Sequence, residues 1–133
     1  MPAHLNLGRE GEALALKHLL GLGYEIVACN WRKGSYEIDF VCVDGDEVVF
    51  VEVKTRSSNV HGLPGQALDR NKARSLIRAA VHFLNDRDWW SRPCRFDLVS
   101  VLMHGTGRTM EHEKNVIDAS AALGRGHSSW QPW

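Results

Sequence analysis

The chain has 133 residues, of which 44% are hydrophobic and 24% charged, a composition typical of one soluble globular domain. Sixteen basic residues balance 16 acidic ones, so the molecule carries no overall charge that would attract a polyanion, and any nucleic-acid site has to be local. No segment approaches the roughly 18 apolar residues that span a bilayer, and the N-terminus lacks the pattern of a signal peptide, which predicts a cytoplasmic protein.

The first half of the chain predicts one helix followed by three strands. Residues 6–21 carry leucines at helical spacing, which predicts a helix, and Gly21 and Gly23 indicate its end. Residues 24–31 are rich in strand formers and lead into polar turn residues. Residues 36–43 and 47–55 are rich in Val, Ile and Phe, and the short Asp-Gly-Asp segment between them predicts a tight hairpin.

The second half predicts one helix and one or two further strands. Residues 57–65 are typical of a loop, and apolar residues then recur at helical spacing over residues 67–84. Residues 95–103 predict a strong strand, and a turn at 104–107 leads into a weaker strand at 109–117. The order αβββαβ(β) predicts an α/β fold with a central mixed sheet flanked by helices. We expect a single domain over residues 1–123 and a mobile tail over residues 124–133.

The register of the predicted hairpin decides which acidic side chains lie together, because alternate residues of a strand share one face. If the first two residues after Val43 form the loop, as their Asp-Gly sequence favours, Asp39 and Glu52 are diagonal neighbours on one face. A four-residue loop would pair these two acids directly, and a three-residue loop would place them on opposite faces. Lys54 follows Glu52 by two positions and points the same way. The other face is expected to receive Ile38, Phe40, Val49, Val51 and Val53.

Asp39, Glu52 and Lys54 form a candidate site for metal-dependent chemistry. Two adjacent carboxylates repel each other unless a cation neutralises them, and Mg²⁺ and Mn²⁺ prefer such oxygen ligands. In phosphodiester hydrolysis the metal would polarise a phosphoryl oxygen and acidify a water, and the lysine would stabilise developing charge. A cross-strand salt bridge on a solvated face is the alternative. Glu12 shares a helical stripe with two leucines, where a carboxylate is costly unless it is paired.

Basic residues near this face are candidates for phosphate binding. Arg70, Arg74 and Arg78 lie four apart on the second predicted helix, with Lys72 beside them. A solvated helix face is the alternative interpretation of this stripe. Basic residues of the helix and of the preceding strand could instead surround one cleft. The candidate nucleic-acid-binding residues are Arg32, Arg56, Lys72, Arg74 and Arg78.

Several motifs occur together in the order found in one known family. They are Gly8-x-x-Gly11-Glu12, Gly23-Tyr24, Asn30-Trp31-Arg32, Glu37-Ile38-Asp39, Phe50-Val51-Glu52-Val53-Lys54-Thr55-Arg56 and Arg95-Phe96-Asp97. Over residues 8–101 the chain resembles the uncharacterised bacterial YraN family. That family is similar to the PD-(D/E)XK nuclease superfamily, whose restriction-endonuclease-like core resembles archaeal Holliday junction resolvases.

The resemblance implies a restriction-endonuclease-like core and roles for five residues. Asp39 and Glu52 match the metal-binding acids of the superfamily, and Lys54 matches its catalytic lysine. Glu12 matches the acid contributed by the first helix, which also places it among the metal ligands. Gln66 lies where some members have a supporting glutamine. The family usually reads Gly-Glu-Ile-Asp, whereas this chain has a serine and a tyrosine between the glycine and the glutamate.

The residues and the resemblance together predict a Mg²⁺- or Mn²⁺-dependent endonuclease that hydrolyses phosphodiester bonds in DNA, with branched or otherwise structured DNA as the expected substrate. The alternative is a non-catalytic nucleic-acid-binding module or adaptor on the same fold, which the zero net charge favours. DNA is expected as the partner rather than RNA, and no membrane partner is expected. The oligomeric state is open, with a homodimer as one option because junction-resolving relatives act as dimers.

Overall fold

The computed structural model describes residues 3–57 and 68–118 and confirms the predicted α/β fold. Its elements are α1 (Ala3–Gly21), β1 (Glu25–Lys33), β2 (Tyr36–Asp44), β3 (Glu47–Ser57), α2 (Arg70–Arg87), β4 (Cys94–His104) and β5 (Gly107–Glu113). The predicted tail at residues 124–133 and the predicted glutamine Gln66 lie outside the described residues. No helix in the described ranges is long and apolar enough to cross a membrane.

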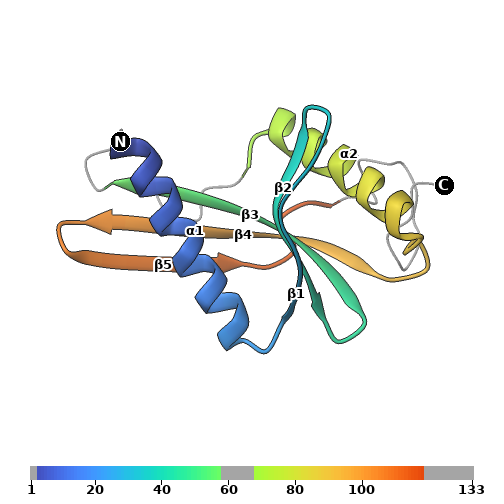
Figure 1. Ribbon diagram of the computed structural model, residues 1–133, viewed down its shortest axis with the longest axis horizontal. Helices are drawn as coiled ribbons and strands as arrows, with labels where there is room; N and C mark the ends of the chain where they lie inside the picture. The colour runs from blue at the N-terminus through green and yellow to red at the C-terminus, as the bar shows by residue number, and fades with distance from the viewer. Residues whose placement is uncertain (1–2, 58–67, 119–133) are drawn as a thin grey trace.

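The five strands form one mixed sheet in the order β1-β2-β3-β4-β5 (Figure 1). Strands β3 and β4 run parallel, and every other neighbouring pair is antiparallel. Two parallel neighbours require a crossover connection, and α2 is part of the one that joins β3 to β4. The central strand β3 therefore has an antiparallel neighbour on one side and a parallel neighbour on the other.

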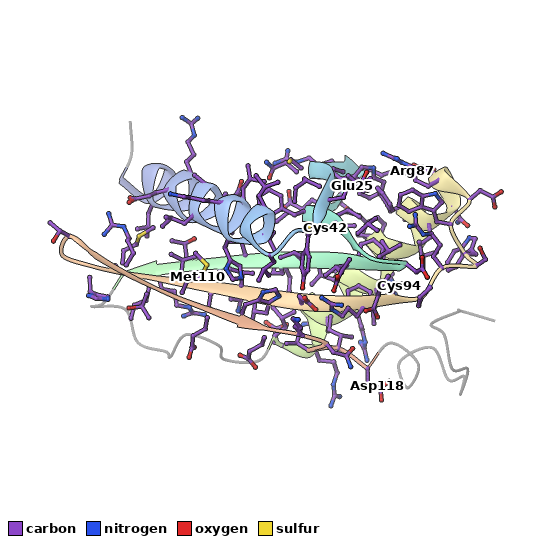
Figure 2. All side chains as sticks on the ribbon, turned by 90° about the horizontal axis from the view of Figure 1, so that it is seen from below. Glu25, Cys42, Arg87, Cys94, Met110 and Asp118 are labelled. Carbon is purple, nitrogen blue, oxygen red and sulfur yellow. The ribbon has the colours of Figure 1, made fainter. Side chains whose placement is uncertain are left out.

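The two helices pack against opposite faces of the sheet, because alternate side chains of β3 enter two separate cores. Val48 and Phe50 belong to the core beneath α2, where Phe50 packs against Phe83 and Phe96. The intervening residues, Val49 and Val51, belong to the core beneath α1. Figure 2 shows α1 lying along one side of the sheet. A strand buried on both faces is expected to be apolar throughout, which is the pattern of residues 48–51.

Helix α1 contacts the sheet partly through small residues. Within residues 7–21 the buried positions are Gly11, Ala15 and Leu19, and a Cβ atom on Gly11 would collide with the side chain of Thr55 on β3. Of the predicted stripe of Glu12, Leu16 and Leu19, Leu19 is buried, whereas Glu12 and Leu16 are half-buried beside the row. The close approach at Gly11 places Glu12 at the rim of the α1 interface, near the end of β3.

The β2–β3 hairpin has a different register from the one favoured by the Asp-Gly sequence. Asp44 pairs with Glu47, so the two-residue loop consists of Gly45 and Asp46 rather than Asp44 and Gly45. Gly45 has φ of 65°, and the hairpin loop that begins with a glycine in this conformation is a common type. The register equals that predicted for the longer, four-residue loop, in which Asp39 lies opposite Glu52.

Strand β2 leaves β3 at Asp39. The last backbone pair between the two strands is Phe40 with Val51, whereas β2 stays paired with β1 beyond this point. Ile38 packs in the core beneath α2 and Phe40 in the core beneath α1, so the expectation that these two residues share a face is wrong. The alternation of side chains is interrupted at Asp39 because the strand bends there.

Candidate metal site at the end of the β2–β3 hairpin

Two acidic side chains meet where β2 and β3 separate. The carboxylate of Asp39 accepts a hydrogen bond from the backbone N–H of Val53 at 2.8 Å, which takes the place of a further backbone pair. The carboxyl groups of Asp39 and Glu52 are in hydrogen-bonding contact with each other. Glu52 is only 9% exposed. The sequence pattern predicts this juxtaposition, and the structure brings the two residues together.

The environment of the pair favours its protonated form. Burial and the negative charge of Asp39 together raise the pKa of Glu52 to about 7, against the opposing effect of Lys72. Burial also raises the pKa of Asp39, although the hydrogen bond from Val53 and the charge of Lys72 lower it. Two carboxyl groups in contact cannot both ionise without cost, so the pair favours the uptake of a proton. A cation could replace that proton.

The cation that contacts the pair is Lys72, which lies in the first turn of α2. Its Nζ atom lies 3.3 Å from Oε2 of Glu52. The backbone N–H of Lys72 donates to the carboxylate of Asp69, the N-cap residue of the helix, at 2.8 Å. The salt bridge anticipated at this face is therefore formed by Lys72 and not by Lys54.

Lys54 lies two residues beyond Glu52 on β3, as predicted, and is half-buried. It pairs in the parallel ladder with Ser100 and forms no ion pair within the described part of the chain. Together with Leu7, Thr55, Arg56 and Ser57 it lines an open hollow of about 440 Å³. Lys54 is thus placed at the end of the strand that carries Glu52, next to a space that is accessible from solvent.

Glu12 is the third acid of the site. Burial raises its pKa, as do the charges of Asp39 and Glu37, and a side-chain hydrogen bond with Asn30 lowers it. Across the residues that the structure describes, no three His, Cys, Asp or Glu side chains form a cluster that could hold a metal ion. Mg²⁺ is commonly bound by one or two carboxylates and keeps several waters, so the Asp39–Glu52 pair fits such an ion. A direct role of Glu12 as a ligand stays a prediction.

Asn30 is a site residue that the sequence reasoning missed. It lies on β1 between Cys29, which pairs with Phe40, and Trp31, which pairs with Ile38, so it faces Asp39 across the strands. Its φ of 50° is left-handed, a conformation that asparagine tolerates better than most residues. Asn30 therefore bends β1 at the position where β2 bends and also hydrogen-bonds Glu12. The sequence signal that could have indicated this bend is the position of an asparagine inside a run of strand formers.

The candidate nucleic-acid-binding residues are distributed over several surfaces. Arg70, Arg74 and Arg78 are exposed on one stripe of α2, as their spacing predicts. Arg70 and Arg74 line a hollow of about 600 Å³ between α2 and residues 116–118. Arg32 pairs with the exposed Glu37 at 3.2 Å, and Arg56 lines the smaller hollow with Lys54. Lys72 points toward Glu52 instead of joining the arginine stripe.

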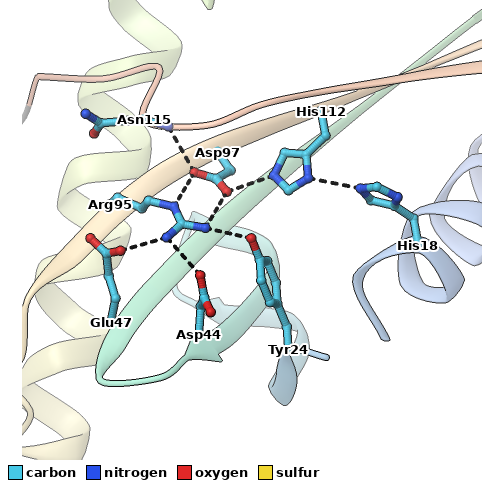
Figure 3. A network of polar contacts seen from close by, with 8 residues as sticks. All are labelled: His18, Tyr24, Asp44, Glu47, Arg95, Asp97, His112 and Asn115. Carbon is cyan, nitrogen blue, oxygen red and sulfur yellow. Dashed lines mark hydrogen bonds and ion pairs between the residues drawn. The ribbon is translucent and has the colours of Figure 1, made fainter. Parts of the chain in front are cut away.

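A second group of polar side chains lies on the α1 side of the sheet (Figure 3). Asp97 on β4 is 1% exposed and accepts hydrogen bonds from Nε of Arg95 and the backbone N–H of Asn115, both at 3.0 Å. Nε2 of His112 lies 2.8 Å from the same carboxylate, and Nδ1 of His112 lies 3.0 Å from Nε2 of His18. Burial opposes the ionisation of Asp97, but hydrogen bonds from His112, Arg95 and Asn115 outweigh it and lower its pKa.

Arg95 connects this group to the turn of the β2–β3 hairpin. Its guanidinium donates to Glu47 at 2.7 Å and to Asp44 at 3.3 Å, the two residues that flank the loop, and to the hydroxyl of Tyr24 at 2.8 Å. Burial and the nearby acids act in opposite directions on the guanidinium, and the acids prevail, so the pKa of Arg95 is raised. The register that places Asp39 opposite Glu52 is thus held from the other end of the hairpin.

The mixed sheet, the crossover through α2 and the acid pair at the end of the hairpin are consistent with a restriction-endonuclease-like core. The family model described as Uncharacterised protein family UPF0102 matches residues 11–101. The chain belongs to this family, which is the YraN family indicated by its motifs.

Relatives from several bacteria cover nearly the whole chain. A UPF0102 protein of Nitratidesulfovibrio vulgaris strain DP4 is 48% identical over 128 residues, which span 95% of this chain and 94% of the relative. A UPF0102 protein of Lawsonia intracellularis is 41% identical over 127 residues, with 96% of each chain covered. A third, from Porphyromonas gingivalis, is 39% identical over 119 residues, covering 88% of this chain and 87% of the relative.

Proposed function

We propose that the protein is a Mg²⁺- or Mn²⁺-dependent endonuclease that hydrolyses phosphodiester bonds in DNA, with branched or otherwise structured DNA as its substrate. The observation that carries the proposal is the contact between the carboxyl groups of Asp39, which is half-buried, and Glu52, which is buried. Holding two such groups together costs free energy, and strongly perturbed carboxyl groups are concentrated at functional sites. A divalent ion would offset this cost by neutralising the two carboxylates.

Each residue of the site has a task in this reaction. Asp39 and Glu52 would hold the metal, which when bound polarises a phosphoryl oxygen and lowers the pKa of a water molecule. The hydrogen bond from Val53 orients Asp39, so that one of its oxygens is fixed and the other is directed into the site. Lys54, next to the open hollow, would stabilise the negative charge that develops on the phosphoryl group. Glu12 would bind a water of the metal's hydration shell.

The substrate would be held by local positive charge, because the whole chain has none in excess. Arg74 and Arg78 offer two exposed guanidinium groups on one face of α2, at a spacing that suits successive phosphate contacts. Arg56 lies beside Lys54 at the hollow. Arg32 is already paired with Glu37, so its contribution to DNA binding is expected to be the smallest of the set.

A cleavage assay tests the proposal. Labelled linear, flapped and four-way DNA would be incubated with Mg²⁺ or Mn²⁺ and with wild-type protein, Asp39→Asn or Glu52→Gln. We expect both variants to lose cleavage by at least about a hundredfold, since the metal provides both the nucleophile and the charge stabilisation. Glu25→Gln is the matched control, because this acid is exposed and lies at the start of β1, away from Asp39. Equal cleavage by wild type, Asp39→Asn and Glu52→Gln would overturn the catalytic assignment.

A non-catalytic nucleic-acid-binding module is the second candidate. The ion pair between Lys72 and Glu52 favours it, because a lysine that permanently neutralised the acids would leave no need for a metal. Calorimetric titration of Mn²⁺ into wild type and Glu52→Gln separates the two candidates. Metal binding that is lost in the variant supports the endonuclease, whereas DNA binding without any metal binding supports the module.

A further inference from the structure

We infer that Lys72 is an internal counter-cation, which neutralises Glu52 in the metal-free protein and gives this acid up when a divalent ion binds. The inference rests on the proposed metal site and adds a competing group to it. Lys72 is a positioning residue in this scheme, because it acts on the arrangement of the two acids.

The geometry of the ion pair provides the first support. Nζ of Lys72 lies 3.3 Å from Oε2 of Glu52, and its positive charge also acts on Asp39. The side chain of Glu52 is 11% exposed and that of Lys72 is 36% exposed. Water screens this pair less than a surface pair, so the ammonium group stabilises the acids substantially. It nevertheless keeps a route to solvent.

The position of Lys72 in α2 provides the second support. Its backbone N–H is bonded to the N-cap residue Asp69, so the main chain at this position is fixed. The flexible four-carbon side chain can move without disturbing the helix. Arg74, two residues further on, is exposed and lines the hollow between α2 and residues 116–118. Lys72 therefore differs from the other basic residues of the helix in facing the acid pair.

The charge of Lys72 opposes the binding of a divalent ion at the two acids. An ion held by Asp39 and Glu52 would carry two positive charges within a few ångströms of the present position of the ammonium group, and the two cations would repel each other. They also compete for the same oxygens of Glu52. Lys72 thus keeps the two acids together in the absence of metal, and it lowers the affinity for metal. Lys54 forms no ion pair with either acid in the described ranges and is not expected to compete.

Calorimetric titration with Mg²⁺ tests the inference on the full chain. The measurement is made at about pH 9, where the carboxyl groups are ionised and proton release does not dominate the heat. We expect Lys72→Gln to bind Mg²⁺ roughly tenfold more tightly than wild type, because a nearby like charge and a competitor have been removed. Lys72→Arg, which keeps the charge, and Arg74→Gln, which removes a charge outside the pair, should bind as wild type does.

Thermal unfolding provides a second measurement. If Lys72 only stabilised the fold, its replacement would lower the melting temperature equally with and without Mg²⁺. In EDTA, Lys72→Gln should melt at a lower temperature than wild type, because the acids lose their counter-ion. With saturating Mg²⁺ the difference should vanish or reverse. A deficit of equal size under both conditions, or unchanged Mg²⁺ affinity in Lys72→Gln, would overturn the role of Lys72 while leaving the metal site intact. A wild-type protein that binds neither Mg²⁺ nor Mn²⁺ would overturn both this inference and the proposed function.

Discussion

The carboxylate of Asp39 accepts a hydrogen bond from the backbone N–H of Val53 at 2.8 Å. A side chain of β2 thereby uses a main-chain donor of β3 at the position where the two strands stop pairing. Because Val53 directly follows Glu52, the bond fixes the distance between the two acids. The site is thus built by the separation of a hairpin, and the donor released by that separation is satisfied within the site itself.

Asp39→Asn should raise the stability of the metal-free protein while abolishing metal binding. Asparagine can still accept the hydrogen bond from Val53, and Glu52 keeps its ion pair with Lys72. Removing one of two adjacent carboxylates relieves their repulsion, which should add about 1 kcal/mol to the free energy of unfolding at about pH 8. Urea unfolding in EDTA measures this gain, and a loss of stability would contradict the expected relief of repulsion.

The raised pKa of Glu52 makes the metal-free protein less stable at high pH. A carboxyl group with a pKa of about 7 in the folded state and 4.5 as a free group binds more protons when folded. Its contribution is fully present below pH 4.5 and is lost as the pH rises to about 7. We expect a loss on the order of 2 kcal/mol in EDTA.

The control for this pH dependence is Glu52→Gln, which lacks the titrating group. Urea unfolding of both proteins between about pH 4.5 and 8 gives the difference that belongs to Glu52, since the other groups titrate in both. Identical pH profiles for the two proteins would show that Glu52 does not titrate abnormally. Saturating Mg²⁺ should remove most of the loss in wild type only.

The contact of Gly11 with Thr55 predicts a large effect of a single methyl group. Gly11→Ala would force the added carbon into the threonine side chain and push α1 away from β3, at a cost of about 2 kcal/mol. Gly8→Ala is the matched control, because an added carbon there meets nothing within 4 Å and the helix propensity improves. Thr55→Ala in the Gly11→Ala background should restore part of the stability. Chemical unfolding of the four proteins checks these values.

Arg95→Met should destabilise the protein by about 3 kcal/mol. The variant leaves Asp97 buried without its guanidinium partner and frees the hairpin turn at Glu47. Lys33→Met is the control, because the ion pair of Lys33 with Asp86 is exposed on both sides and is expected to contribute little. Urea unfolding at about pH 7 gives both values. If Arg95→Met lost no more free energy of unfolding than Lys33→Met, the contacts of Arg95 with Asp97 and Glu47 would not stabilise the hairpin.

Replacing Arg74 and Arg78 together by alanine should weaken DNA binding about tenfold. The slope of log affinity against log salt should fall by roughly two, because each arginine is expected to neutralise one phosphate. Lys17→Ala is the control, because Lys17 is exposed on α1, on the other face of the sheet. Fluorescence anisotropy over a series of salt concentrations measures both quantities. An unchanged slope would show that Arg74 and Arg78 do not bind phosphates and form an ordinary solvated surface.

Apolar patterns, strand-forming residues and turn residues together predicted the helices, the strands and the hairpin, because the apolar pattern of each element follows from burying one or both of its faces. The register of the hairpin was predicted incorrectly. The local Asp-Gly preference favoured one loop, whereas the structure places Gly45 first in the loop and pairs Arg95 with the residues on either side. Arg95 is remote in sequence, so no local rule contains this contact.

The acids of the site could be predicted, and their partners could not. Asp39 and Glu52 share a face in either even-length loop, so the error in register did not separate them. The pairing of Lys72 with Glu52 depends on where α2 crosses the sheet, and the bend at Asn30 depends on the path of two strands. Both are consequences of tertiary arrangement that a spacing pattern does not encode.

The attachment of Arg95 to Asp44 and Glu47 also limits where foreign sequence can be inserted. The exposed turn at Gly45 would ordinarily suit an epitope tag or a fused domain, as surface turns do. Here an added residue would have to break the two contacts of Arg95 or shift β2 by one position, which would turn Asp39 to the wrong side of the sheet. A tag in this turn would therefore be expected to disrupt the acid pair at the opposite end of the hairpin.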